Sequence, residues 1–265
     1  NRYAADLVAT HPIMPMLFIS IACGAISGFH ATQSPMMARC MTNERQARPI
    51  FYGAMVAEGV VALIWAAATI TFTGGYEGLS AYMADPAHGP GSLIHEISQS
   101  WFGVVGGIVA MIGVIAAPIT TGDTALRSAR LIVADFARFD QRRFWQRALV
   151  ALPLFVLTFL LLQIDFNVLW RYFAWSNQTL AVFTLWACTA YLARRGKMYI
   201  ITFIPAMFMT VVCTAYLLVA PSPEGFGLDH VLGVSTGCVL AGLFAGMFMR
   251  WKRALRPEIV PPVAD

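Results

Sequence analysis

Seven apolar stretches, each long or nearly long enough to cross a lipid bilayer, constrain this chain more than any other feature. They occupy residues 13–29, 50–73, 102–121, 148–164, 174–193, 198–219 and 231–249. A helix needs roughly 20 mostly apolar residues to cross the hydrocarbon core. Only 12% of the residues are charged, against about 25% in soluble domains. The sequence therefore predicts an all-α polytopic membrane helix bundle of about seven transmembrane helices.

The basic residues predict the orientation of these helices, because Lys and Arg collect in cytoplasmic connections. Of the 18 basic residues, 16 lie in the alternate connections 39–48, 127–147, 194–197 and 250–256. The other connections hold a single base, Arg171. This pattern puts the N-terminus of the chain outside and its C-terminus in the cytoplasm. Because the chain begins with Asn on the outer side and shows no signal sequence, we expect further transmembrane helices upstream of it.

Charge and cysteine usage exclude several partners. The net charge of +4 reflects topology, and no basic stripe with interleaved aromatics lies outside the juxtamembrane loops, so no nucleic-acid partner is expected. The lipid bilayer, with an anionic surface, is the expected neighbour. The five cysteines have no C-x-x-C spacing, which favours small buried side chains over a disulfide or metal site. We expect no metal and no cofactor.

The segment SGFHATQSPMMAR, residues 27–39, places polar residues directly after a long apolar run. Gly28 and Pro35 weaken a helix, and Ser34 before Pro35 has the pattern of an N-cap followed by proline at the first helical position. The segment is predicted to be a broken helix that builds a substrate or ion site. The alternative is that the span ends at Phe29 in a cytoplasmic exit turn. The candidate substrate-binding residues are His30, Thr32, Gln33 and Ser34.

The segment APITTGDTALRSAR, residues 117–130, has a similar design at the cytoplasmic end of the third span. Pro118 and Gly122 suggest a second break, because both weaken a helix. In the alternative reading, one of the polar residues only caps the helix that follows. Thr120 and Thr121 lie between the two helix breakers, and Asp123 follows Gly122 directly. Thr120 and Thr121 are candidate substrate-binding residues.

Glu58 is the only Asp, Glu, Lys, Arg or His inside the seven apolar spans. A charged group at the bilayer centre costs about 3 kcal/mol on insertion scales, so such residues are usually functional. Glu58 and Asp123 are therefore the candidate proton-coupling residues. The alternative for Glu58 is a neutral, hydrogen-bonded side chain that locks two helices together.

The segment WRYFAWSNQTLA, residues 170–181, combines three interfacial aromatics with four consecutive polar residues that enter the next span. A single polar residue there would be a helix cap. Four in succession point in several directions, so at least one is expected to face a cavity or another helix. Asn177 and Gln178 are candidate substrate-binding residues.

Three further segments concern packing. The connection 74–101 has apolar residues at helical spacing and fits a short helix in the outer interface. Residues 123–143 are partly amphipathic, and either extend the third span or lie along the membrane. In the last span, small residues four apart predict close helix packing: Gly233, Gly237, Ala241 and Ala245, beside a second row of Cys238, Gly242 and Gly246.

Four strings of residues resemble the carbon starvation protein A (CstA) family of bacterial inner-membrane transporters: ISGFHATQSPMMARCM, GAMVAEGVVALIWAA, APITTGDTALRSARLIVAD and FNVLWRYFAWSNQTLA. The resemblance implies an inverted-repeat fold of the amino-acid/polyamine/organocation type, of which this chain is the C-terminal portion. It assigns residues 1–140 to the transport core and 141–256 to the C-terminal helical region. The Pro-rich residues 257–265 are expected to be a loosely ordered tail. The expected partner is a missing N-terminal transmembrane half.

The resemblance further implies proton-coupled import of short peptides or pyruvate across the inner membrane, linked to carbon starvation. No enzyme activity is expected, because the chain has no familiar hydrolase, metalloprotease or nucleotide-binding motif. Two alternatives remain. One is a membrane sensor that binds the nutrient without transporting it, and the other is an intramembrane enzyme whose nucleophile and base would come from Ser27, His30, Ser34 and Asp123.

Overall fold

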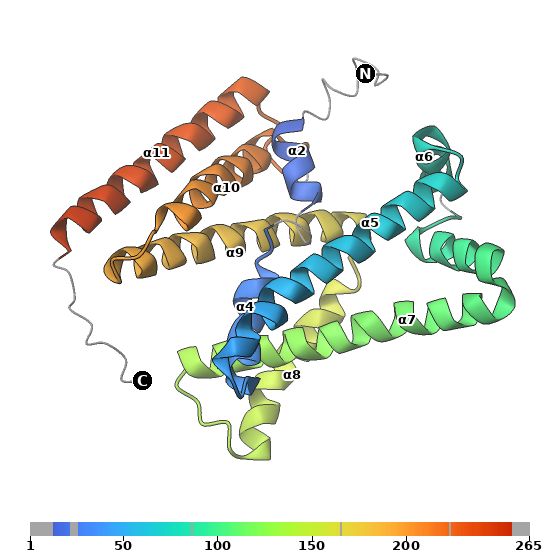
Figure 1. Ribbon diagram of the computed structural model, residues 1–265, viewed down its shortest axis with the longest axis horizontal. Helices are drawn as coiled ribbons and strands as arrows, with labels where there is room; N and C mark the ends of the chain where they lie inside the picture. Colours follow the sequence, from blue (N-terminus) through green and yellow to red (C-terminus); the bar gives the residue numbers. More distant parts are fainter. Residues whose placement is uncertain (1–12, 22–25, 86, 165, 223, 256–265) are drawn as a thin grey trace. The chain divides into compact units, whose positions relative to one another are not determined.

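The computed structural model describes residues 13–21, 26–85, 87–164, 166–222 and 224–255 (Figure 1). These residues form helices and connecting turns, with no strand among them, which confirms the all-α prediction. The chain divides into two compact units: unit 1 comprises Asn1–Thr32 and Leu157–Asp265, and unit 2 comprises Gln33–Val156. Helices α4 (Phe29–Cys40) and α8 (Phe144–Leu161) each run from one unit into the other. The family-based division near residue 140 stays a prediction, and the predicted tail 257–265 lies outside the described residues.

Unit 1 is a small helix bundle. Helices α9 (Phe166–Arg194), α10 (Ile200–Val219) and α11 (His230–Ala254) lie side by side, in yellow, orange and red in Figure 1, and the short α2 (Ile13–Ser20) packs against α10. Helix α10 is apolar on almost every side, as expected for a helix that packs between neighbours. The core side chains are Ile19, Val182, Met209, Val212, Cys213, Tyr216 and Ala220.

One of the two rows of small residues on α11 faces α10. Gly233, Gly237 and Ala241 are buried, whereas Cys238 and Gly242 are exposed. A Cβ atom on Gly233 would lie 2.4 Å from Val219 Cγ2 of α10. The first row therefore lets the two backbones approach closely, which confirms the packing prediction for that row.

A pair of matched glycine variants tests this interface. Gly237→Ala is expected to lower the free energy of unfolding by about 1–3 kcal/mol through overpacking, because its Cβ would lie 2.8 Å from the Val211 carbonyl oxygen. Gly242→Ala is the control, because nothing lies within 4 Å of its added Cβ. Thermal unfolding in detergent measures the difference. Equal unfolding temperatures for the two variants would contradict close packing at Gly237.

Unit 2 has long helices and a small described core. After α4, a 3₁₀ turn η1 (Glu44–Gln46) and a π-helical turn η2 (Arg48–Gly53) lead into α5 (Ala54–Phe72). Then follow α6 (Tyr76–Ala84) and the 47-residue α7 (Pro90–Phe136). The buried residues Ala68, Leu93 and Ile97 join α5 to the first part of α7.

The connection predicted at 74–101 is helical, but it contains two pieces rather than one. These are α6 and the first part of α7, which ends in a kink where Gly103 has a φ of 69°. Only glycine adopts such a positive φ without strain. Beyond the kink, α7 continues to Phe136, so the alternative that residues 123–143 extend the third span is confirmed as far as that residue.

Among the described residues, five helical segments are long and apolar enough to cross a membrane: Glu44–Phe72, Pro90–Phe136, Phe144–Leu161, Ile200–Val219 and His230–Ala254. They correspond to five of the seven predicted spans. Of the predicted span 13–29, the described residues comprise the eight-residue α2, the non-helical residues 26–28 and the first residue of α4. Helix α9 has 29 residues, but its polar cluster interrupts the apolar run. The count of seven therefore stays a prediction.

The second predicted break is wrong. Helix α7 runs without interruption through Pro118 and Gly122, and its only non-helical φ/ψ is at Gly103. Proline is tolerated in transmembrane helices where Ser or Thr side chains supply hydrogen bonds near the site. Here Thr120 Oγ1 donates to the Ala117 carbonyl at 2.9 Å. Thr120, one of the two threonines that suggested a loop, is therefore bonded to its own helix.

Candidate functional site

The first predicted break exists, but it lies upstream of the expected position. Helix α2 ends at Ser20 and α4 begins at Phe29, and residues 26–28 between them are non-helical. The predicted helix start at Ser34 and Pro35 is wrong, because both lie inside α4. The start of α4 is fixed instead by a residue far away in the sequence.

Asn177 of α9 caps α4. Its Oδ1 accepts a hydrogen bond from the Phe29 backbone N–H at 2.9 Å, and its Nδ2 donates to Ser27 Oγ at 3.1 Å. Its carbonyl accepts from the Gly28 N–H at 3.1 Å. Ser27 and Asn177 are 8% and 6% exposed. These bonds satisfy backbone groups that the break would otherwise leave unpaired in an apolar environment.

Gly28 makes this contact possible. A Cβ at this position would lie 2.4 Å from the Asn177 carbonyl oxygen and 2.7 Å from Leu180 Cβ. Real Cβ atoms do not approach other atoms so closely. We call the contact between residues 27–29 and Asn177 the break junction. His30 continues it, with Nδ1 at 3.2 Å from the Ser27 carbonyl.

Gln178 lies beside the junction and is only 1% exposed. Its Nε2 donates to the Phe18 carbonyl of α2 at 3.1 Å, which fixes the orientation of the amide because a carbonyl needs a donor. Its Oε1 is buried and has no hydrogen-bond partner among the described residues. A buried acceptor without a partner costs about 1–3 kcal/mol, so this oxygen is suited to a hydrogen-bond donor.

The two predicted polar segments meet within unit 2. Gln33 Nε2 of α4 lies 3.5 Å from Thr124 Oγ1 of α7, which is long for a hydrogen bond. Thr120 and Thr121 are exposed on α7, and Thr124 also donates to the carbonyls of both. The remaining α4 candidates, Thr32 and Ser34, are half-buried.

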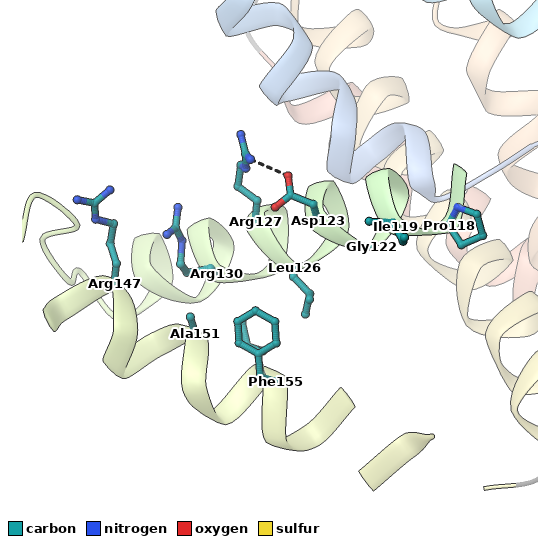
Figure 2. A pocket seen from close by; sticks show the side chains of 11 residues that line it. Pro118, Ile119, Gly122, Asp123, Leu126, Arg127, Arg130, Arg147, Ala151 and Phe155 are labelled. Atoms are coloured by element: carbon teal, nitrogen blue, oxygen red, sulfur yellow. Dashed lines mark hydrogen bonds and ion pairs between the residues drawn. The ribbon is translucent and has the colours of Figure 1, made fainter. Parts of the chain in front are cut away.

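Asp123 forms an ion pair beside a cavity. Its Oδ2 lies 2.6 Å from Arg127 Nη2, one helical turn further along α7 (Figure 2). Both side chains are more than half exposed, so protons and ligands in solution can reach the ion pair. The cavity, of about 680 Å³, lies between α7 and α8 within unit 2. Its lining residues are Pro118, Ile119, Gly122, Asp123, Leu126, Arg127, Arg130, Arg147, Ala151, Leu154 and Phe155.

Glu58 lies apart from these contacts. Its side chain is exposed on α5, and no hydrogen bond or ion pair joins it to another described residue. Among the described residues, no three His, Cys, Asp or Glu side chains come together as a metal site. The cavity arginines were not among the predicted site residues, although the spacing of Asp123 and Arg127 by four positions is a recognisable helical ion pair.

The chain is similar to known membrane proteins. The family model described as Carbon starvation protein CstA matches residues 3–99 and 73–216. An uncharacterized protein of Haemophilus influenzae is 47% identical over 121 residues, which cover 46% of this chain and 88% of that protein.

Two relatives carry functional names. The pyruvate/proton symporter BtsT of Escherichia coli is 51% identical over 53 residues, and the peptide transporter CstA of the same organism is 48% identical over 58 residues. These matches cover 20% and 22% of this chain, but only 7% and 8% of the two transporters. No solved structure matches the chain.

Proposed function

The chain belongs to the carbon starvation protein CstA family, and from this premise we propose that it takes part in proton-coupled import of a small nutrient, either short peptides or pyruvate. The names of two relatives, a peptide transporter and a pyruvate/proton symporter, support transport as the general role. The proposed location is the bacterial inner membrane, with the C-terminus in the cytoplasm, and the proposed context is the carbon-starvation response.

The observation that carries the proposal is the break junction. A non-helical segment lies within a bundle of apolar helices, and its backbone is satisfied by the buried Asn177. Discontinuous helices of this kind form the substrate and ion sites of secondary transporters. Asn177 already bonds protein groups, so we assign it the role of positioning the break. His30, Thr32, Gln33 and Ser34 follow on α4 and are assigned to substrate contact.

The ion pair between Asp123 and Arg127 supplies a mechanism for coupling. When a proton binds the Asp123 carboxylate, Arg127 loses its anionic partner and its guanidinium becomes available to a carboxylate on the substrate. Release of the proton restores the original pair and displaces the substrate. Proton and substrate therefore bind together, with Thr120 and Thr121 as neighbouring hydroxyl contacts. Glu58 is proposed as a second proton carrier.

Both proposed cargoes carry a carboxylate, but they differ in hydrogen-bond donors. A peptide has an ammonium group and amide N–H groups, whereas the pyruvate anion has only acceptors. The buried Gln178 Oε1 is an acceptor without a partner among the described residues. Protein atoms enclose this oxygen in the structure, so it does not distinguish the two cargoes, and both remain proposed.

The test is uptake into proteoliposomes with an imposed pH gradient. Labelled dipeptide and labelled pyruvate are offered to the chain alone and to the chain joined to the N-terminal helices of a longer relative. We expect accumulation of one of the two cargoes, and a protonophore is expected to abolish that accumulation. If both preparations bind a cargo without accumulating it, the protein is a sensor and not an importer. Chemical change of the cargo would indicate an enzyme.

A further inference from the structure

The cavity between α7 and α8 carries more positive charge than its own acid neutralises. Three arginines and one aspartate line it, and Asp123 pairs with Arg127. Neither Arg130 nor Arg147 has a carboxylate partner among the described residues. The Nε of Arg130 is buried without a hydrogen-bond partner in the same part of the chain. The cavity therefore presents two uncompensated guanidinium groups.

The arginines and the apolar residues line different parts of the cavity. Figure 2 shows Arg130 and Arg147 extending to the same side from α7 and α8. Below them, Leu126 and Phe155 point toward each other between the helices. Ile119, Ala151 and Leu154 extend the apolar lining. A ligand that fits both parts is an anion with an attached apolar chain.

The aromatic residues next to the cavity indicate its depth in the membrane. Phe144 and Trp145, in the first turn of α8, are 70% and 80% exposed. Exposed Trp side chains at the end of an apolar helix are typical of the lipid headgroup region. Arg147 lies in the next half-turn, on the side that the distribution of basic residues predicts to be cytoplasmic. The arginines are thus expected at the level of the lipid phosphates.

We propose that this cavity binds the phosphate of an anionic phospholipid, with Arg130 and Arg147 as the ligands and the apolar lining against the acyl chains. Guanidinium groups bind phosphate oxygens in a bidentate manner, and basic pockets between transmembrane helices bind anionic headgroups. A free phosphate offers the same anion, but it would leave the apolar lining uncovered. The proposal does not depend on transport, because it requires no substrate and no proton gradient.

The test is native mass spectrometry of the purified chain in detergent, with phosphatidylglycerol, phosphatidylcholine or inorganic phosphate as the probe. Phosphatidylglycerol is expected to remain bound, and the double variant Arg130→Gln/Arg147→Gln is expected to weaken it by at least about tenfold. The matched control Arg142→Gln/Arg143→Gln removes the same charge from exposed positions that do not line the cavity, and should retain the lipid.

If both double variants lose phosphatidylglycerol equally, the lipid is held by general charge attraction and not by this cavity, and the proposal is overturned. Equal retention of phosphatidylcholine would also overturn it. If inorganic phosphate displaces the lipid at comparable concentration, the site is one for free phosphate. If the first double variant does not fold, the single variants Arg147→Gln and Arg143→Gln, both at exposed positions, are compared instead. Arg147→Gln is then expected to weaken phosphatidylglycerol binding more than Arg143→Gln does.

Discussion

Gly28→Ala is expected to abolish uptake and to destabilise unit 1. The added Cβ would lie 2.4 Å from the Asn177 carbonyl oxygen and 2.7 Å from Leu180 Cβ, so the chain at residue 28 must move away from α9. Overpacking costs about 1–3 kcal/mol, and loss of the cap on α4 adds about 0.5–2 kcal/mol. Thermal unfolding in detergent and gradient-driven uptake measure the two effects.

Gly113→Ala is the control for this prediction. Gly113 lies in the apolar part of α7, and nothing is within 4 Å of its added Cβ. The variant should unfold at or slightly above the temperature of the unmodified chain, because alanine favours a helix by about 1 kcal/mol over glycine. If Gly28→Ala behaves like this control in both measurements, the break junction does not form as described.

The break junction also shows what the sequence could predict and what it could not. The polar residues after the first apolar run correctly indicated an interruption. Its position depended on Asn177, 148 residues from Phe29, and no local pattern contains such a contact. The pair Ser34 and Pro35 fits an N-cap motif, but the tertiary cap fixes the helix start one and a half turns earlier.

The second polar segment failed for a related reason. Pro118 and Gly122 each weaken an isolated helix, but the thirteen residues from Pro118 to Arg130 lie inside a continuous α7. Propensity is a weak guide where side chains bond their own helix, as Thr120 and Thr124 do. Packing patterns were more reliable, because the spacing of Gly233 and Gly237 depends only on helix geometry.

The cavity illustrates a third limit. In the sequence, Arg130 and Arg147 served to predict topology. That prediction depends only on the side of the membrane on which they lie. Their shared cavity follows from α7 and α8 lying next to each other there, which composition does not encode. Charge patterning thus predicts which side of the membrane a segment occupies, but not which arginines have no acidic partner.

Asp123→Asn is expected to separate substrate binding from proton coupling. The amide cannot bind and release a proton, so accumulation driven by the pH gradient should be lost. Arg127 remains positively charged and loses its anionic partner, so it still binds a substrate carboxylate. Exchange of labelled for unlabelled substrate should therefore persist. For one proton per substrate, a gradient of about one pH unit supports about tenfold accumulation, and the variant should show none.

Stability cannot account for that outcome. The pair of Asp123 and Arg127 is exposed and spaced by four residues, and such pairs contribute only about 0.3–0.5 kcal/mol. Asp135→Asn, an exposed carboxylate on the same helix, is the matched control and should accumulate substrate normally. Glu58→Gln tests the second proposed carrier by the same two assays. If the double variant Asp123→Asn/Glu58→Gln still accumulates substrate against the gradient, neither carboxylate carries the proton, and coupling must involve residues outside this pair.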